Sequence, residues 1–327
     1  MSAVPTIAVD CMGGDHGPQV TIPALRGLNE LATLKLFGDC DQIRAVMASH
    51  DMIPEAFELV SAPDRLTSEA GLRQVLKRWP GTSTGAALAC HRSGQAAAVV
   101  SAADTAALLA LSRHLLGTAP GVERPMIARE FLGQRGAFWM ADLGANVTCT
   151  PPQLHAFAHL TRKAAQLLSN IKQPRIALLN IGTEQGKGPA ALRATASLMG
   201  ADPELDFIGF VEPSELFENA ADVVICDGLV GNIALKSIEG TATMARHLVR
   251  QEIQTTGPLQ RAALSLLKPA LQRIRESLDT DRYNGAQFLG LNGLVIKSHG
   301  AASQAAFGHA VRRAVVAVQH RLAGTTA

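Results

Sequence analysis

Residues 8–18, AVDCMGGDHGP, decide the fold because they describe a buried strand that runs into a glycine loop and then into a helix. The apolar run Thr6–Val9 ends at the acid Asp10, and two glycines and a second acid follow. Pro18 suits the first turn of a helix, and the free amide groups at such a helix start hold anions. The stretch therefore predicts a strand–loop–helix unit with an anion at its loop.

The loop itself carries candidate site residues. Gly13 and Gly14 allow the backbone to approach a ligand closely. His16 donates to a bound phosphate in one interpretation, and in the other it only hydrogen-bonds Asp15 at the start of the helix. Asp10 and Asp15 are expected to orient the donors.

The rest of the chain repeats this alternation of short apolar runs and helical stretches, which predicts an α/β fold with a mostly parallel, doubly wound sheet and a mainly helical part after residue 228. Most of the runs lack polar alternation, as strands buried on both faces do. The predicted strands are Thr6–Val9, Leu34–Phe37, Phe57–Val60, Ala97–Val100, Ala137–Met140, Ile176–Leu179, Phe207–Ile208 and Val223–Cys226. The predicted helices include Gln19–Leu31, Ser83–Arg92, Thr105–Leu115, Pro151–Leu168 and Ala190–Met199.

Short polar residues and glycines follow five of the predicted strands. Ligands of open α/β sheets bind at the carboxyl ends of the strands, so these residues together predict one convergent site. Each of them taken alone is also an ordinary turn or helix-capping residue. They are Asp10, Ser101, Asp142, Asn146, Asn180, Gly182, Thr183, Glu184, Asp227 and Gly228.

Composition excludes several classes of function. Of the 327 residues, 47% are hydrophobic, but charged residues interrupt the most apolar stretch, so no membrane span is expected. We expect no signal peptide, because the start lacks a basic region followed by an apolar one. The five scattered cysteines favour reduced thiols in a cytoplasm over disulfides or a zinc site. With 4% aromatic residues, stacking on single-stranded nucleic acid is disfavoured.

Two further glycine-rich segments offer anion contacts without a nucleotide signature. NIGTEQGKG (180–188) has one residue too few before Lys187 for a P-loop, and no Ser or Thr follows that lysine. DGLVGNIALKSIEG (227–240) runs from a strand end into a helix, where Asn232 and Lys236 share one face. No GxGxxG or GxSxG motif is present, and no histidine is fixed by sequence as a base for Cys11.

The chain resembles the PlsX family of phosphate acyltransferases. The resemblance rests on AVDCMGGDHGP (8–18), DLGANVTCTPPQL (142–154), ALLNIGTEQGKG (177–188), ADVVICDGLVGNIALKSIEG (221–240) and FLGLNGLVIKSHG (288–300), which keep the family's order over nearly the whole length. It implies transfer of a fatty acyl group from acyl carrier protein to inorganic phosphate, giving acyl phosphate for phospholipid synthesis. It also implies a cytoplasmic homodimer, one domain over residues 1–327 with a fold like isocitrate and isopropylmalate dehydrogenases, and no metal or other cofactor.

Residue type assigns candidate roles within that reaction. Phosphate is already a nucleophile and a thiolate leaves easily, so the site needs an anion cradle, donors to the carbonyl oxygen and alignment. The candidate catalytic residues are His16, Asn146, Thr183, Asn232 and His299. The candidate binding residues are Asp10, Gly13, Gly14, Asp15, Ser101, Thr105, Asp142, Asn180, Gly182, Glu184, Lys187, Asp227, Gly228 and Lys236.

Other functions remain open from the sequence. SAADTAA (101–107) stands where the family usually has SAGNTGA, which keeps open a diverged, inactive scaffold that binds acyl carrier protein or membrane. A phosphate acyltransferase that uses coenzyme A thioesters is a second alternative, and a dehydrogenase is the least favoured.

The charge is uneven along the chain. Residues 241–327 hold 11 Lys/Arg and 4 Asp/Glu, although the whole chain has a net charge of only +2. A basic amphipathic segment at about 241–282 is expected to meet acidic acyl carrier protein or to lie against an anionic membrane at the inner face of the cell. The alternative is a helix packed on the core or at a dimer interface.

Overall fold

One continuous sheet organises the part of the chain that the computed structural model describes, which is residues 4–66, 71–184, 186–255, 281 and 284–320. Within these residues the sheet has 11 strands in the order β3-β2-β1-β4-β11-β10-β5-β6-β9-β7-β8. The strands are β1 (Thr6–Asp10), β2 (Thr33–Gly38), β3 (Glu58–Ser61), β4 (Ala98–Ser101), β5 (Met126–Gly133), β6 (Gly136–Ala141), β7 (Arg175–Leu179), β8 (Asp206–Val211), β9 (Val223–Ile225), β10 (Ala286–Leu289) and β11 (Val295–Lys297).

Most neighbouring strands are parallel, and the exceptions lie in the middle of the sheet. β5 pairs antiparallel with both β6 and β10, and β10 pairs antiparallel with β11. β11 then runs parallel to β4, so the last two strands join the two halves of the sheet. The α/β class with a mostly parallel sheet is confirmed.

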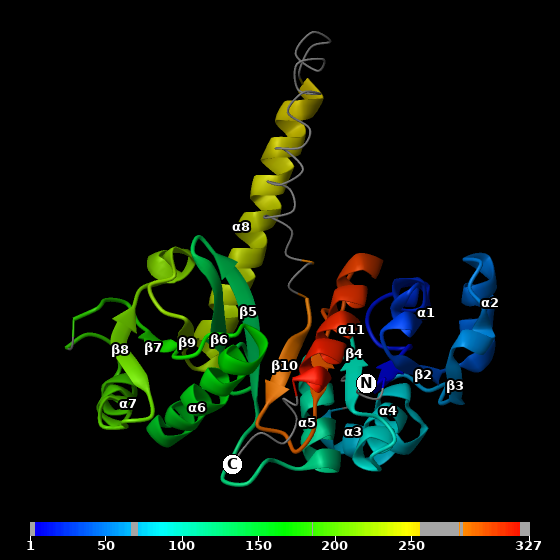
Figure 1. The fold of residues 1–327 in the computed structure, drawn as a ribbon, viewed down its shortest axis with the longest axis horizontal. Helices are drawn as coiled ribbons and strands as arrows, with labels where there is room; N and C mark the ends of the chain where they lie inside the picture. The colour runs from blue at the N-terminus through cyan, green and yellow to red at the C-terminus, as the bar shows by residue number, and fades with distance from the viewer. Residues whose placement is uncertain (1–3, 67–70, 185, 256–280, 282–283, 321–327) are drawn as a thin grey trace.

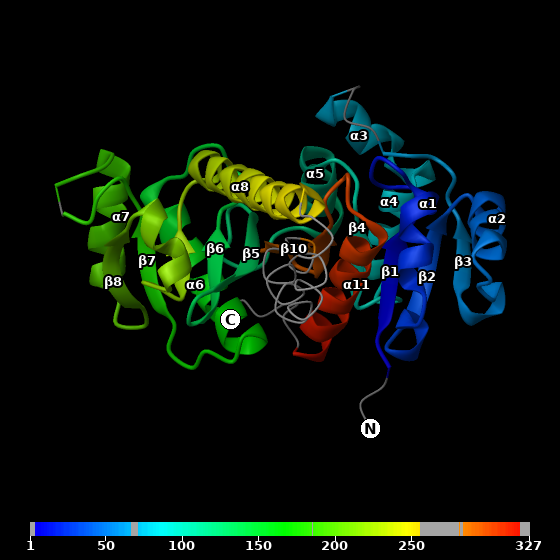
Figure 2. The same cartoon turned by 90° about the horizontal axis from the view of Figure 1, so that it is seen from above.

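Helices cover both faces of the sheet (Figure 1, Figure 2), and each face has its own apolar core. Side chains of a strand alternate between the two, as Val9 and Ala8 of β1 do. One face carries α1 (Pro18–Thr21), α2 (Cys40–Ser49), α6 (Pro151–Leu168), α7 (Ala190–Gly200) and α11 (Gln304–Gln319). The other face carries α3 (Leu72–Arg78), α4 (Ser83–Arg92), α5 (Thr105–Leu116) and the first turns of α8 (Gly228–Thr255).

One expectation about the helices is wrong. Residues 19–31 do not form one helix, because Pro23 and Gly27, which has φ +73°, divide them into α1 and the short 3-10 turns Pro23–Leu25 and Leu28–Glu30. After residue 228 most of the described residues are helical, in α8 and α11, as predicted, although the short strands β10 and β11 lie between these helices in the sequence. β5, β10 and β11 were not among the predicted strands.

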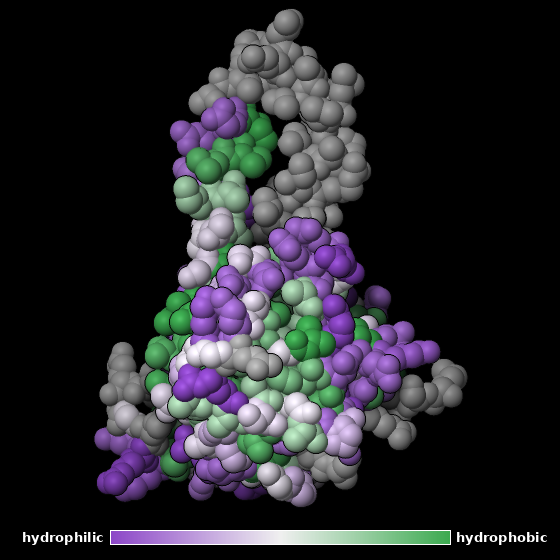
Figure 3. Space-filling view, turned by 90° about the vertical axis from the view of Figure 1, so that its left-hand side faces the viewer, coloured by the Kyte–Doolittle hydropathy of each residue, from purple (hydrophilic) through white to green (hydrophobic). Residues whose placement is uncertain are grey.

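Helix α8 begins on the sheet and then projects from the body of the molecule (Figure 1). Its projecting part exposes apolar side chains, among them Met244, Leu248 and Ile253, next to polar ones (Figure 3). α8 covers residues 241–255 of the predicted basic segment, and residues 256–280 and 282 of that segment lie outside the described part. No helix among the described residues is long and apolar enough to cross a bilayer.

The first turn of α8 packs against the end of β6 so closely that only glycine fits. A Cβ on Gly231 would lie 1.9 Å from the carbonyl oxygen of Asp142, whereas a Cβ on Gly240 in the same helix would meet nothing within 4 Å. The position of α8 over the sheet therefore depends on residue 231.

We expect Gly231→Ala to lower the free energy of unfolding by about 2–4 kcal/mol, because backbone has to shift to admit the methyl group. Gly240→Ala is the matched control and should raise it by up to about 1 kcal/mol through helix propensity. Urea denaturation of both variants measures the difference. Equal effects at the two positions would contradict the close packing at residue 231.

Candidate active site

A cleft of about 950 Å³ opens at the carboxyl ends of β1, β4 and β11, and α8 forms its opposite wall. These parallel strands are neighbours in the sheet, so the loops that follow them meet at one edge. The predicted site residues that line this cleft are Gly14, Asp15, Thr105, Asn232, Lys236 and His299.

Asp10 connects the loops that surround the cleft through buried hydrogen bonds. Its carboxylate is fully buried and accepts hydrogen bonds from the hydroxyl groups of Ser83, Thr84 and Ser101, each at 2.6 Å. It also accepts the amide protons of Met12 and Gly13, at 3.2 and 3.1 Å. These donors come from β4, from the start of α4 and from the loop after β1, so Asp10 positions the loops and does not face the cleft.

The glycines of the first loop serve close packing between loops. A Cβ on Gly13 would lie 2.8 Å from the Ala103 nitrogen, and one on Gly14 would lie 2.8 Å from the Gly300 carbonyl oxygen. Gly14 also has φ +83°, which favours glycine. The loops after β1, β4 and β11 therefore touch, and any larger residue at 13 or 14 would push them apart.

Asp142 has the same positioning role at the end of β6. Its carboxylate accepts amide protons from Ile127, Gly144, Ala145 and Asn146, and also from the side chain of Asn146. Burial raises the pKa of Asp142, and these hydrogen bonds partly offset that rise.

Asn146 lies beneath the site rather than in the cleft. It is buried, and its Nδ2 donates to Asp142 and to the carbonyl oxygen of Pro125 at 2.9 Å each. Its own carbonyl oxygen accepts the amide proton of Gly228, and Asp227 accepts that of Val230. These bonds fix the start of α8 on the sheet.

Two lysines supply positive charge to the cleft. Lys236 reaches it from α8, and Lys297 reaches it from the end of β11. Burial lowers the pKa of Lys297 to about 8, the nearby carboxylate of Asp104 opposes that shift, and the charge of Lys236 adds to it. Sequence reasoning did not select Lys297, although KSHG directly after an apolar run was a visible signal.

His299 and Lys236 direct donors toward the same point. The Nδ1 atom of His299 accepts the amide proton of Ala301 at 3.1 Å, so a neutral ring carries its proton on Nε2. That Nε2 atom lies 3.4 Å from the ammonium nitrogen of Lys236. Burial and then the charge of Lys236 lower the pKa of His299, which favours the neutral ring. Two facing donors without an acceptor between them are the arrangement that an anionic oxygen satisfies.

Lys236 also belongs to a chain of ion pairs. Its ammonium donates to Glu239 at 2.8 Å, and Glu239 also pairs with the buried Arg129 at 3.3 Å. Burial lowers the pKa of Arg129, and Glu239 opposes that shift. The chain holds Lys236 over the cleft.

The loop 180–188 lies elsewhere. β7, which it follows, is six strand positions from β4, roughly 29 Å along the sheet. Within the described residues that line the cleft, none belongs to this loop. Lys187 pairs with Glu184 at 2.8 Å, Asn180 donates to the carbonyl oxygen of Lys187 at 3.2 Å, and Thr183 is exposed. A Cβ on Gly182 would lie 2.5 Å from the Lys187 side chain.

The remaining candidates divide by exposure. His16 is exposed and lines a small cavity next to the cleft, together with His299 and Gly300. Cys11 is fully buried, and burial raises the pKa of its thiol well above the ordinary value, so it is not an activated nucleophile. Ala103 and Ala106 are not among the residues with positive φ, so alanine in SAADTAA carries no backbone strain of that kind.

Comparison with known proteins decides the family. The model of the family described as "Fatty acid synthesis protein" matches residues 5–324. A phosphate acyltransferase of Nitrosococcus oceani is 42% identical over 95% of this chain and 92% of its own, and one of Pseudomonas aeruginosa is 40% identical over 98% and 96%. The chain belongs to this family of acyltransferases.

Solved structures show the same fold at low identity. A phosphotransacetylase of Streptococcus pyogenes superposes with a TM-score of 0.63 at 16% identity and covers 98% of this chain and 95% of its own. A branched-chain phosphotransacylase of Enterococcus faecalis gives a TM-score of 0.62 at 16% identity, covering 97% and 100%. A 4-hydroxythreonine-4-phosphate dehydrogenase of Burkholderia phymatum gives 0.52 at 12%, covering 96% and 98%. The dehydrogenase-like fold of this family member agrees with the sequence analysis.

The negative charge of Asp104 should weaken the binding of an anion in the cleft. Its side chain accepts the amide proton of Ala107 at 3.0 Å and caps α5, a role that asparagine fills equally well. Asp104→Asn should therefore keep stability while removing a negative charge beside Lys297. At about pH 6.5, where Lys297 stays protonated even though Asp104 no longer raises its pKa, inorganic phosphate should bind about three- to tenfold tighter at low ionic strength. Calorimetric titration with phosphate measures this.

The control is Asp39→Asn, which makes the same change at the exposed cap of α2. It should leave phosphate binding unaltered. Unchanged affinity in Asp104→Asn would mean that phosphate does not bind beside Lys297.

Proposed function

We propose that the protein transfers a fatty acyl group from acyl carrier protein to inorganic phosphate and releases acyl phosphate for phospholipid synthesis. The observation that carries the proposal is the pair of donors on His299 and Lys236, which face one point in a cleft that also holds Lys297. An anion with several oxygens fits this group of donors. The naming of the relatives as phosphate acyltransferases supports the same reaction.

The chemistry asks for alignment and charge rather than for covalent catalysis. A phosphate oxygen attacks the thioester carbonyl carbon, the C–S bond then breaks, and the thiolate of the carrier leaves with the electron pair. Lys236, Lys297 and the Nε2–H of His299 hold the phosphate, while Asn232 on the facing helix donates to the carbonyl oxygen as negative charge develops there. A neutral His299 is a hydrogen-bond donor, not a strong acid, which suits a leaving group that needs no protonation.

Other sequence candidates take positioning roles in this scheme. Asp10, Ser101, Asp142, Asn146 and Gly228 hold the loops and the start of α8 in place. His16 lies close enough to the cleft, across the shared His299, to meet a substrate. The loop with Thr183 and Lys187 is a separate anion-binding candidate in the same chain.

Partners follow from the same proposal. Acyl carrier protein is the donor, the enzyme acts in the cytoplasm, and a homodimer is its working form. The projecting part of α8 presents Arg246 and Arg250 together with apolar side chains, which suits contact with an acidic carrier, with an anionic membrane surface or with a second copy.

The central test is the dependence of thioester loss on phosphate. Incubation with acyl-acyl carrier protein should consume the thioester only when phosphate is added and should yield acyl phosphate. Lys236→Met should reduce turnover at least about tenfold, because a contact to the reacting phosphate tightens in the transition state. Lys35→Met, a lysine on β2 remote from the cleft, is the control.

Three results would decide against parts of the proposal. Phosphate-independent loss of the thioester would reject the reaction. Equal use of the coenzyme A thioester would favour the alternative donor. Binding of acyl carrier protein without any turnover would favour the inactive scaffold.

The pKa of Lys297 sets a pH dependence. Because burial lowers that pKa to about 8, the cation is lost as the pH rises through this value. The KM for phosphate should therefore rise about tenfold for each pH unit above about 8. Phosphate itself is already largely dianionic there, so its own charge does not cause the change.

Lys297→Arg keeps the positive charge to higher pH and should move the rise upward. Initial rates at varied phosphate between about pH 7 and about pH 9 measure it. A KM that stays flat over this range in the unaltered enzyme would remove Lys297 from the phosphate site.

A further inference from the structure

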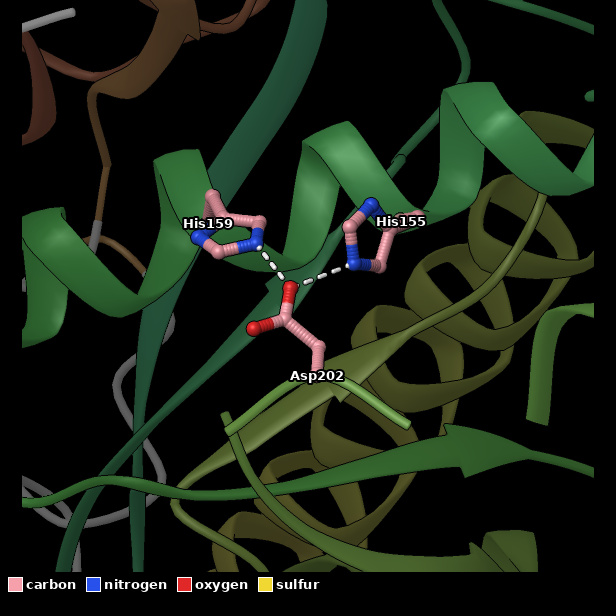
Figure 4. Close-up of side chains that lie close together, drawn as sticks. All are labelled: His155, His159 and Asp202. Atoms are coloured by element: carbon pink, nitrogen blue, oxygen red, sulfur yellow. Dashed lines mark hydrogen bonds and ion pairs between the residues drawn. The ribbon is translucent and has the colours of Figure 1, made fainter. Parts of the chain in front are cut away.

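Three potential metal ligands meet on the side of the molecule away from the cleft. His155 and His159 lie one turn apart on α6, and Asp202 lies just after α7. The Nε2 atoms of the two imidazoles lie 2.7 and 2.8 Å from the same carboxylate oxygen, Oδ2 of Asp202. Figure 4 shows both rings turned toward that oxygen. None of the three is among the described residues that line the cleft.

The spacing of the donor atoms is close to that of a metal site. One nitrogen or oxygen atom from each residue falls within 4.8 Å of the others. Zinc binds imidazole nitrogen and carboxylate oxygen at about 2.0–2.2 Å, which places neighbouring tetrahedral donors roughly 3.3 Å apart. An ion would bind the Nε2 lone pairs while each neutral ring carries its proton on Nδ1, and each nitrogen would need to move about 0.5 Å from the oxygen, a shift that side-chain torsions supply.

The scaffold around the cluster is built to hold these side chains. Residues i and i+4 of a helix share one face, and α6 is fixed at its start by a capping box between Thr150 and Gln153. The second oxygen of Asp202, Oδ1, accepts the amide proton of Glu204 at 2.9 Å, which orients the carboxylate and leaves Oδ2 to face the imidazoles.

A further carboxylate stands behind one histidine. The Nδ1 atom of His159 lies 3.8 Å from Oε2 of Glu204. Metal-bound histidines commonly direct their other ring nitrogen toward a carboxylate, which fixes the tautomer and the ring orientation. The three ligands are each partly exposed, with 29%, 30% and 16% of the side-chain surface of His155, His159 and Asp202 accessible, so an ion can enter from solvent.

We propose that His155, His159 and Asp202 bind one divalent transition-metal ion, with Zn²⁺ the best match, and that water completes the coordination. Two imidazoles and one carboxylate suit zinc and its neighbours rather than Mg²⁺ or Ca²⁺, which take oxygen ligands. The bound ion links α6 to the end of α7. It is separate from acyl transfer, whose cleft has its own residues.

The alternative is a hydrogen-bonded clamp in which the two histidines simply donate to Asp202. Metal binding distinguishes the two. We would titrate the full-length, tag-free protein, first freed of metal by a chelator, with Zn²⁺ by calorimetry and with Co²⁺ by visible absorption. The proposal expects one equivalent of each ion, visible bands typical of a four-coordinate Co²⁺ site, and a higher Tm in saturating Zn²⁺.

Asp202→Asn is the most informative variant because asparagine keeps a hydrogen-bond acceptor for the imidazoles but is a poor zinc ligand. It should fold, lose at least about tenfold in affinity for Zn²⁺, and show no rise in Tm with zinc. His159→Gln should behave likewise. His247→Gln, an exposed histidine on α8, is the matched control and should bind Zn²⁺ as the unaltered protein does.

Two outcomes would overturn the proposal. One is the absence of stoichiometric Zn²⁺ and Co²⁺ binding to the folded protein. The other is binding that Asp202→Asn and His159→Gln leave as tight as in His247→Gln, since the ion would then sit elsewhere.

Discussion

The buried carboxylate of Asp10 is the interaction on which the candidate active site depends. An ion with no exposure is stable only when hydrogen bonds replace water, and five donors do so here. The carboxylate also lies at the start of α4, where the helix dipole favours negative charge. Removing one hydrogen-bond partner of such a buried group typically costs about 1–3 kcal/mol, so the bonds hold the loops after β1 and β4 in one arrangement. The cleft is the space that this arrangement leaves between those loops and α8.

Asp142 has the same positioning role at the end of β6. Asp10 and Asp142 together explain why residue type alone overestimates the number of side chains that take part in the reaction. Both acids follow strands at the carboxyl edge of the sheet, where substrates bind in this class of fold. Both are nonetheless occupied by amides and hydroxyl groups of the protein itself. The residues that face the cleft are others: Asn232 and Lys236 on α8, Lys297 at the end of β11, and His299 just after that strand. A strand-end acid in such a sheet serves the site by ordering loops.

The fold was largely predictable from the sequence because buried parallel strands are continuous apolar runs, as at 176–179 and 223–226. β5 and β10 were missed since MIAREFLG and AQFL contain polar residues and no strong turn signal, and their place in the sheet depends on antiparallel partners far along the chain. The predicted helix over residues 19–31 was wrong because the helix-breaking effects of Pro23 and Gly27 were underestimated. The residue types of the candidate site were predictable from the sequence. The sequence did not show which strand ends are neighbours, because this depends on the strand order, in which β7 lies far from β4. Lys297 needed the structure, because its burial and lowered pKa arise from residues distant in sequence.

The charged side chains of the cleft are arranged in a way that favours an anionic ligand. Lys236 is half exposed and paired with Glu239, which also partners Arg129, so one carboxylate holds two cations in place. Lys297 is buried, and its charge is opposed by desolvation and supported by Asp104. The cleft thus places Lys297, whose pKa burial lowers to about 8, near Lys236, and carboxylates lie close to both lysines. In the proposed function, phosphate supplies a negative charge that favours the protonated form of Lys297 and an oxygen that accepts hydrogen bonds from His299 and Lys236. Under that proposal the attraction is strongest for a compact, multiply charged oxyanion, because its oxygens accept from all three donors at once.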